Sequence, residues 1–192
     1  MNWIGAIEIF AMVTGVAYVV LEIFQKNAMW VIGILTGIAC AFSFAHQQLW
    51  ASMGLNIYYV VVSVIGLVRW KRDGAEAGEG VIHLRKPSAK GLWASLAVFV
   101  LGSAVLVFVL QLLHDQETAL DAIVAVASAV ATWWLTLSWK EQWLVWIAAD
   151  LVSVVLCVKV GMYWMGAMYL VYAGSAVYGY FHWKRFGREI SV

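Results

Sequence analysis

Charge and cysteine are both scarce in this chain of 192 residues. Charged residues make up 12% of it, against roughly 25% in soluble domains, while 64% of its residues are hydrophobic and the mean hydropathy is +0.85. This balance excludes an ordinary soluble domain and is typical of a polytopic membrane protein. The two cysteines, Cys40 and Cys157, lie far apart inside apolar stretches. They therefore offer neither a disulfide framework nor a paired metal motif.

Motifs for catalysis and nucleotide binding are also missing from the sequence. The histidines lie in loops or at span ends, without an H-E-x-x-H or Cys/His cluster. The segment "GAEAGEG" lacks the Lys-Ser/Thr of a phosphate-binding loop, and residues 162–182 contain no lysine for the Schiff base of a photoreceptor. Only isolated carboxylates remain for a membrane-embedded enzyme, and a net charge of +1 gives no support for nucleic-acid binding. We therefore expect no enzyme, no cofactor and no metal.

What the chain does contain is a series of apolar stretches, each near the length of about 20 residues that a spanning helix needs. The first stretch has no basic n-region and no clear cleavage site, so we expect it to be a retained helix. The sequence predicts an all-α integral membrane protein with seven transmembrane helices, at 3–24, 28–45, 49–69, 92–113, 119–137, 142–158 and 162–182.

Lysine and arginine are distributed unevenly over the predicted loops. Six of them lie in 69–90 and more follow in 182–189, whereas the loops at 45–52 and 114–121 contain none. Because basic residues favour the cytoplasmic side, we expect the N-terminus outside and the C-terminus in the cytoplasm. Lys159 is the one basic residue that this orientation places outside.

A single ungapped shift of the sequence aligns the beginning of the chain with its end. It matches Trp30 with Trp143, Tyr59 with Tyr172, Gly66 with Gly179, and "WKR" at 70–72 with "WKR" at 183–185. Spans one to three then correspond to spans five to seven, and the unpaired fourth span keeps both halves in the same orientation. The predicted plan is 3+1+3, a parallel repeat related to the SWEET sugar facilitators, with a substrate site between the halves near the membrane midplane.

This plan divides the chain into five segments. They are a first three-helix bundle at 1–72, a cytoplasmic loop at 73–91, a linker helix with an outer loop at 92–118, a second bundle at 119–185 and a cytoplasmic tail at 186–192. The alternative is that the aromatic matches arise by chance. In that case the tryptophans near span ends are interfacial anchors. We expect this role for Trp30, Trp70, Trp139 and Trp183.

Asp150 lies in the middle of the sixth predicted span, within "WLVWIAAD". A carboxylate at this depth costs about 2.5–3.5 kcal/mol on translocon scales and normally faces a bundle interior or a watery cavity. Trp146 and Trp143 precede Asp150 by four and seven residues, so all three share one helical face. An indole above a carboxylate suits a flat polar or cationic ring. The alternative is a hydrogen bond from Asp150 to a neighbouring helix that only holds the bundle together.

The third span offers a second polar face, formed by Asn56, Tyr59 and Ser63 at i, i+3 and i+7. The repeat adds Tyr172 as the counterpart of Tyr59. We predict that these four residues contribute to a substrate site.

The fifth span carries Asp121, Ser128 and Thr132 at similar spacing. Hydroxyl groups in membrane helices are often packing or backbone-bonding groups, so only Ser128 joins the predicted site. Glu8 and Glu22 lie near opposite ends of the first span, where we expect interfacial solvation.

Four short motifs resemble the PnuC family of bacterial vitamin transporters over nearly the whole chain. They are "WLVWIAAD" at 143–150, "LWASMGLN" at 49–56, "DAIVAVAS" at 121–128 and "GMY" at 161–163. The resemblance implies a homotrimer in the cytoplasmic (inner) membrane that carries nicotinamide riboside by facilitated diffusion, followed by trapping through phosphorylation. It also implies ring stacking by Trp146, a polar contact from Asp150, an amide hydrogen bond from Asn56 and a contact from Tyr59.

The chain departs from the family pattern at three positions. Asp150 stands where riboside transporters commonly have Asn, Thr132 where many members have Gln, and Leu67 where a Trp is common. Members with Asp resemble a thiamin-transporting branch. Both vitamins carry a cationic ring, so thiamin is the alternative substrate. A SWEET-like sugar facilitator and a scaffold without a ligand are the remaining alternatives.

Overall fold

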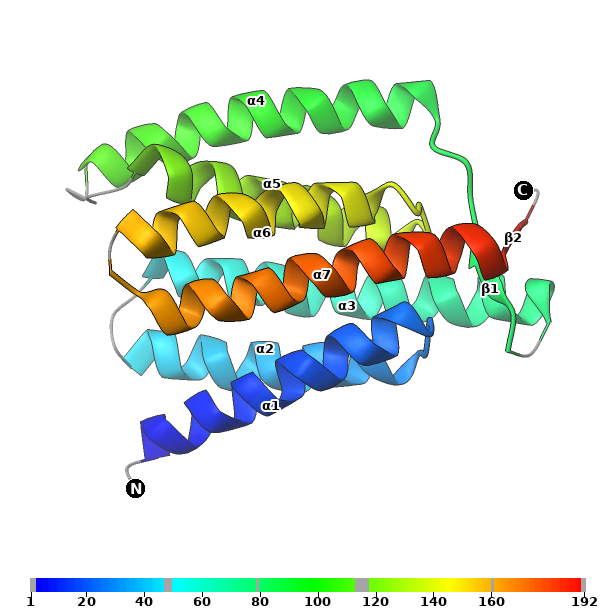
Figure 1. The fold of residues 1–192 in the computed structure, drawn as a ribbon, viewed down its shortest axis with the longest axis horizontal. Coiled ribbons are helices and arrows are strands. Elements are labelled where there is room, and N and C mark those ends of the chain that lie inside the picture. The colour runs from blue at the N-terminus through cyan, green and yellow to red at the C-terminus, as the bar shows by residue number, and fades with distance from the viewer. Residues whose placement is uncertain (1–2, 47–49, 79, 113–117, 160, 191–192) are drawn as a thin grey trace. The chain divides into compact units, whose positions relative to one another are not determined.

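The computed structural model describes residues 3–46, 50–78, 80–112, 118–159 and 161–190, and this part of the chain is almost entirely helical (Figure 1). The prediction of seven helices is confirmed. Residues 47–49 and 113–117 of the predicted outer loops, His114 among them, lie outside the described residues. The helices are α1 (Trp3–Ile23), α2 (Ala28–His46), α3 (Trp50–Ala77), α4 (Ala89–Leu112), α5 (Thr118–Thr136), α6 (Gln142–Lys159) and α7 (Tyr163–Phe186).

Five of these helices are long and apolar enough to cross a membrane: α2, α3, α4, α5 and α6. Within α1 the stretch Val13–Ile23 is a shorter apolar helix. Helix α7 is outside this group of five, and its last turn carries Lys184 and Arg185. The bounds agree closely with the predicted spans except in α3, which continues to Ala77, well beyond the predicted end at 69. A helix can continue past an apolar stretch because charged residues tolerate helical conformation well in water.

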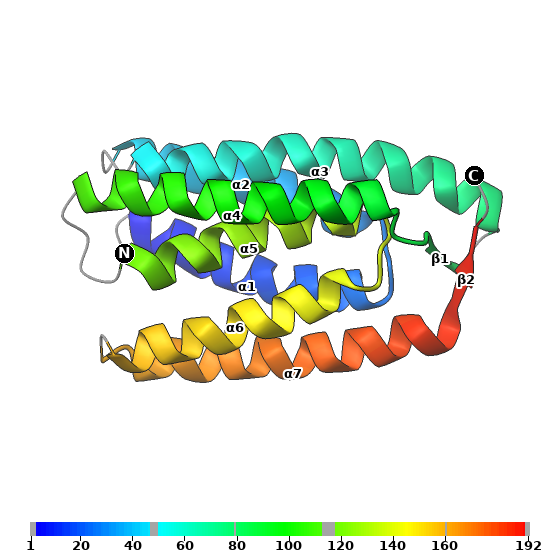
Figure 2. The same ribbon diagram turned by 90° about the horizontal axis from the view of Figure 1, so that it is seen from above.

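The chain forms two compact units. Unit 1 comprises Met1–His83, Thr136–Ser138 and Phe186–Val192, and unit 2 comprises Leu84–Leu135 and Trp139–Arg185. Within unit 1, α2 packs against both α1 and α3 (Figure 1). Within unit 2, α6 lies beside α7 in both ribbon views (Figures 1 and 2), and the α4 hydroxyl of Ser95 accepts a 2.8 Å hydrogen bond from Trp134 Nε1 of α5.

The predicted loop at 73–91 contains a short strand. β1 (Ile82–Leu84) pairs with β2 (Gly187–Glu189) from the end of the chain. The side-chain amide of Gln25 forms two hydrogen bonds with the backbone of His83 in β1. Its Nε2 donates to the His83 carbonyl at 3.0 Å, and its Oε1 accepts from the His83 N–H at 2.7 Å. The amide thus pairs with β1 in the way that the backbone of a neighbouring strand would. The three residues of β1 are buried. The segment that connects α3 and α4 is therefore fixed at β1, which is buried and bonded to both β2 and Gln25.

In unit 1 a tryptophan of α2 lies directly on a glycine of α3. A Cβ atom added to Gly66 would come within 2.5 Å of the Trp30 ring. Trp30 in turn meets Trp70 edge to face, with ring centroids 5.0 Å apart, and both tryptophans are fully buried. Only a residue without a side chain allows this approach.

In unit 2 the same contact recurs between α6 and α7. A Cβ atom on Gly179 would come within 2.7 Å of the Trp143 ring, and Trp143 meets Trp183 edge to face at 5.5 Å. The expectation that Trp30, Trp70, Trp139 and Trp183 are interfacial anchors is wrong, because their exposed fractions are only 0 to 5%. Protein atoms, and not the membrane interface, surround these rings.

The turns that precede the two tryptophans are alike as well. Gln25 and Ser138 both adopt the left-handed conformation, with φ of 50° and 55°, which is uncommon for residues other than glycine. Each turn closes with a hydrogen bond of the kind that ends a helix: Lys26 N–H to the Leu21 carbonyl at 2.8 Å, and Trp139 N–H to the Trp134 carbonyl at 3.1 Å. The shift that matches Trp30 with Trp143 also matches each of these positions with its counterpart.

Replacing either packed glycine with alanine should destabilise the protein by a similar amount. Gly66→Ala and Gly179→Ala each force a methyl group into a buried indole, and overpacking of this kind costs about 1–3 kcal/mol. Thermal melting of the purified protein in detergent measures the loss. Gly54→Ala and Gly174→Ala, in α3 and α7, are the matched controls because a Cβ at either position has no neighbour within 4 Å. Equal melting temperatures for all four variants would contradict the steric argument.

Candidate functional site

Asp150 is buried in α6, with 7% of its surface exposed. Burying a carboxylate is costly unless other groups compensate it. Tyr169 and Tyr172, which follow one another on the same face of α7, are both close enough to Asp150 for an electrostatic interaction. Their ring centroids are 6.3 Å apart, in an edge-to-face arrangement. The structure thus places Asp150 of α6 near Tyr172 and Tyr169 of α7.

Trp146 lies one helical turn before Asp150 and is half-buried. Its indole Nε1 is shielded from solvent and finds no hydrogen-bond acceptor among the described residues. Buried donors are nearly always paired in folded proteins, so an unpaired one calls for an explanation. A bound molecule that accepts this hydrogen bond would supply it.

Trp143 lies one turn before Trp146 on the same face of α6, and its environment is different. Its ring is pressed against Gly179 and Trp183, and only 2% of its surface is exposed. Like the Nε1 of Trp146, the buried Nε1 of Trp143 meets no acceptor among the described residues. The predicted alignment of Trp143, Trp146 and Asp150 therefore combines a side chain that packs α6 onto α7 with a half-buried indole and a buried carboxylate one turn apart.

Two hydroxyl residues of α5 are buried, and one of them forms a hydrogen bond to the backbone of the same helix. Ser128 and Thr132 are 7% and 4% exposed, and the Thr132 hydroxyl donates to the Ser128 carbonyl at 2.8 Å. This bond within one helix is common for hydroxyl residues in membrane helices. Asp121 also interacts electrostatically with Tyr169, which adds α5 to the polar cluster of unit 2.

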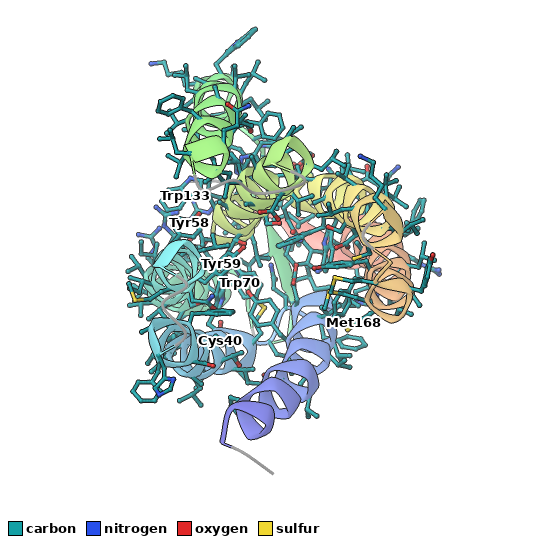
Figure 3. All side chains as sticks on the ribbon, turned by 90° about the vertical axis from the view of Figure 1, so that its left-hand side faces the viewer. Cys40, Tyr58, Tyr59, Trp70, Trp133 and Met168 are labelled. Carbon is teal, nitrogen blue, oxygen red and sulfur yellow. The ribbon has the colours of Figure 1, made fainter. Side chains whose placement is uncertain are left out.

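Unit 1 contains a second polar cluster, around the small residue Gly33 of α2. A Cβ atom at Gly33 would come 2.9 Å from the Ser63 hydroxyl and 3.1 Å from the Tyr18 ring. Tyr18 of α1 interacts electrostatically with Glu22 and with Tyr59. Figure 3 shows Tyr59 and Trp70, both on α3, in a view along the helices. Of the α3 residues predicted for the site, Tyr59 and Ser63 therefore meet α1 and α2 here.

Four residues of these clusters were missing from the predicted set: Tyr18, Glu22, Asp121 and Tyr169. The expectation of interfacial solvation for Glu22 is wrong, because Glu22 is only 3% exposed. The turn at Gln25 folds the chain back directly after α1, which encloses the last helical turn. Two signals were present in the sequence: Tyr18 and Glu22 are spaced four apart on one helical face, and Tyr169 occupies the repeat position of Asn56.

The predicted residues thus belong to two separate clusters. Unit 1 holds Asn56, Tyr59 and Ser63, and unit 2 holds Ser128, Trp143, Trp146, Asp150 and Tyr172. Both clusters pair aromatic rings with a buried carboxylate, Glu22 in the first and Asp150 in the second. Such groups suit a ligand with a flat ring and several hydrogen-bonding groups.

Comparison with known proteins identifies the family. Residues 5–185 match the model of a family described as nicotinamide mononucleotide transporter. The nicotinamide riboside transporter PnuC of Haemophilus influenzae is 26% identical over 153 residues, which cover 74% of this chain and 66% of that protein. The riboflavin/roseoflavin transporter RibM of Streptomyces davaonensis is 25% identical over 160 residues, which cover 80% of this chain and 73% of that protein.

A solved structure agrees with this assignment. The crystal structure of the vitamin B3 transporter PnuC superimposes with a TM-score of 0.70 at 25% identity, over 96% of this chain and 81% of that one. Together with the apolar helices, the match places the chain among multi-pass transporters of the inner membrane. The chain belongs to the nicotinamide mononucleotide transporter family, whose PnuC members are membrane transporters and not enzymes.

Proposed function

We propose that this protein carries nicotinamide riboside into the cell by facilitated diffusion. The observation that carries the proposal is the buried Asp150 carboxylate with the unpaired indole N–H of Trp146 one turn away. The relatives named for nicotinamide riboside and vitamin B3 support the same substrate class.

The chemistry of the riboside fits the two clusters. Its pyridinium ring is flat and cationic, so it can stack on the Trp146 indole while Asp150 balances its charge. Its carboxamide needs both a donor and an acceptor, which the side chain of Asn56 provides. Each unit offers hydroxyl groups that can pair with those of a ribose: Tyr59 and Ser63 in unit 1, and Ser128 and Tyr172 in unit 2.

Thiamin is the second candidate, favoured by one observation. Position 150 carries a carboxylate, and the aminopyrimidine of thiamin can donate hydrogen bonds to a carboxylate. The riboflavin transporter among the relatives supports variation of the vitamin within one fold. A SWEET-like sugar carrier is the third candidate, and it would need no cationic ring.

We also propose that the chain is a 3+1+3 parallel repeat on the SWEET-type plan, with α1–α3 equivalent to α5–α7. The support comes from local geometry that recurs under the one shift that matches Trp30 with Trp143. The recurring features are the left-handed residues Gln25 and Ser138 and the tryptophan-on-glycine contacts. In this proposal α4 links the two halves.

The cellular setting of the proposal has three parts. Basic residues at 69–90 favour a cytoplasmic C-terminus, which cysteine labelling of intact cells against inverted vesicles would test. A homotrimer is expected, and its mass can be measured by native mass spectrometry. Phosphorylation inside the cell then traps the vitamin, so accumulation above the outside concentration should require a riboside kinase even though the carrier itself consumes no ATP.

Substitutions at Asp150 should separate the two vitamins. Calorimetric titration of the purified protein with nicotinamide riboside should show saturable binding. Asp150→Asn should retain saturable binding because its amide oxygen still accepts a hydrogen bond, but with lower affinity because the cationic ring loses its balancing charge. Asp150→Leu should weaken it about tenfold or more, since a hydrogen bond to a charged group contributes roughly 1.5–3 kcal/mol.

Thiamin is titrated in parallel, and Glu76→Gln, at an exposed position of α3, serves as the control for loss of a carboxylate outside both polar clusters. Binding of thiamin alone, lost in Asp150→Asn, would overturn the riboside assignment and establish the alternative. Absence of binding by either vitamin, in protein that melts cooperatively, would reject both.

Trp146→Phe should weaken riboside binding about fivefold. Phenylalanine keeps a flat ring but removes the indole N–H, and one hydrogen bond contributes about 1 kcal/mol. The same calorimetric titration measures the change. Trp93→Phe is the matched control, because Trp93 lies on α4 and is 71% exposed. Unchanged affinity in Trp146→Phe would show that the unpaired N–H has no part in binding.

A further inference from the structure

Unit 2 contains a groove that belongs to neither polar cluster. It has a volume of about 550 Å³ and is bordered by α4, α5 and α6. Its walls are almost entirely carbon, formed by Leu96, Phe99, Ala127, Val130, Leu144 and Ala148. The polar groups at the α4–α5 wall satisfy one another, since Trp134 Nε1 donates to the Ser95 hydroxyl. The groove therefore offers an apolar ligand a surface without competing hydrogen bonds.

The dimensions of the groove suit a hydrocarbon chain. Along α4 its lining runs from Leu92 to Phe99, a rise of about 10 Å at 1.5 Å per residue. One leaflet of the hydrocarbon core is about 15 Å thick. Helix α4 exposes large apolar side chains along its length, among them Leu96, Leu101 and Phe108, as expected for a helix in contact with lipid.

A pair of opposite charges lies at one end of this groove. Glu141 lines it, immediately before α6, and its Oε1 lies 3.8 Å from the Nζ of Lys140. This separation is longer than a hydrogen bond. The second carboxylate oxygen, Oε2, is buried and meets no donor among the described residues. Both side chains remain about one-third exposed, at 29% and 32%, so a head group can still reach the pair.

The charged end of the groove is also where α4 begins. A Cβ atom on Gly91, in the first turn of α4, would come within 2.6 Å of the Trp139 ring. Residues 139–141 and the start of α4 are thus neighbours. A ligand in the groove would place its polar end beside Lys140 and Glu141 and its apolar end along α4.

We propose that this groove binds one phospholipid with a zwitterionic, primary-amine head group. The ammonium of phosphoethanolamine donates hydrogen bonds to the Glu141 carboxylate, its phosphate pairs with the Lys140 ammonium, and one acyl chain fills the groove. A choline head group has no N–H to donate, and a glycerol head group donates only from uncharged hydroxyl groups, so neither offers Glu141 a cationic hydrogen-bond donor.

Native mass spectrometry of the delipidated full-length protein tests the proposal. Phosphatidylethanolamine, phosphatidylcholine and phosphatidylglycerol with identical acyl chains are added separately. The first bound lipid should favour phosphatidylethanolamine about tenfold, the ratio that a charge-assisted hydrogen bond supplies. Glu141→Gln should abolish this preference. Glu76→Gln, at an exposed position of α3, should leave it unchanged.

Ala148→Phe is the complementary variant, since its ring fills the groove and should reduce binding of the first lipid for all three head groups. Equal binding of the three lipids by the wild type would overturn the proposal. So would a preference that persists in Glu141→Gln, or a preference for phosphatidylglycerol. A change of oligomeric mass in Ala148→Phe with unaltered lipid binding would assign the groove to a second copy of the chain instead. Should Ala148→Phe not fold, the near-isosteric Glu141→Gln decides alone.

Discussion

The contact of a buried tryptophan ring with a glycine backbone is the constraint on which the helix packing depends. Trp30 on Gly66 fixes α2 against α3, and Trp143 on Gly179 fixes α6 against α7. Each ring is also held edge to face by a second tryptophan, so it cannot move aside. Because an indole buries a large apolar area, one such contact brings together helices that otherwise offer few polar interactions.

The same contact sets the positions of the polar groups. Three and seven residues after the packed tryptophan, α6 carries Trp146 and Asp150, whereas α2 carries Gly33 and Gly37. A Cβ atom on Gly37 would meet Val60 at 2.7 Å. In α2 these positions therefore allow close packing, and in α6 they carry an indole with an unpaired N–H and a buried carboxylate.

The helices and the central polar residues could be predicted from the sequence because they depend on local properties. Apolar length defines a helix, and a carboxylate such as Asp150 is conspicuous inside an apolar run. The missed features depend on contacts between distant segments. Trp70 and Trp183 resemble interfacial anchors in sequence, and their burial depends on tryptophan rings of the preceding helix. The strand β1 depends on Gln25 and on the end of the chain, so no local pattern indicated it.

The most direct test of the central claim is uptake of labelled nicotinamide riboside into proteoliposomes that contain the purified protein without ATP or an ion gradient. The account predicts saturable uptake that stops when the two concentrations are equal, and accelerated exchange when unlabelled riboside is loaded inside. Uptake that requires a sodium or proton gradient, or that accumulates riboside above the outside concentration, would contradict it.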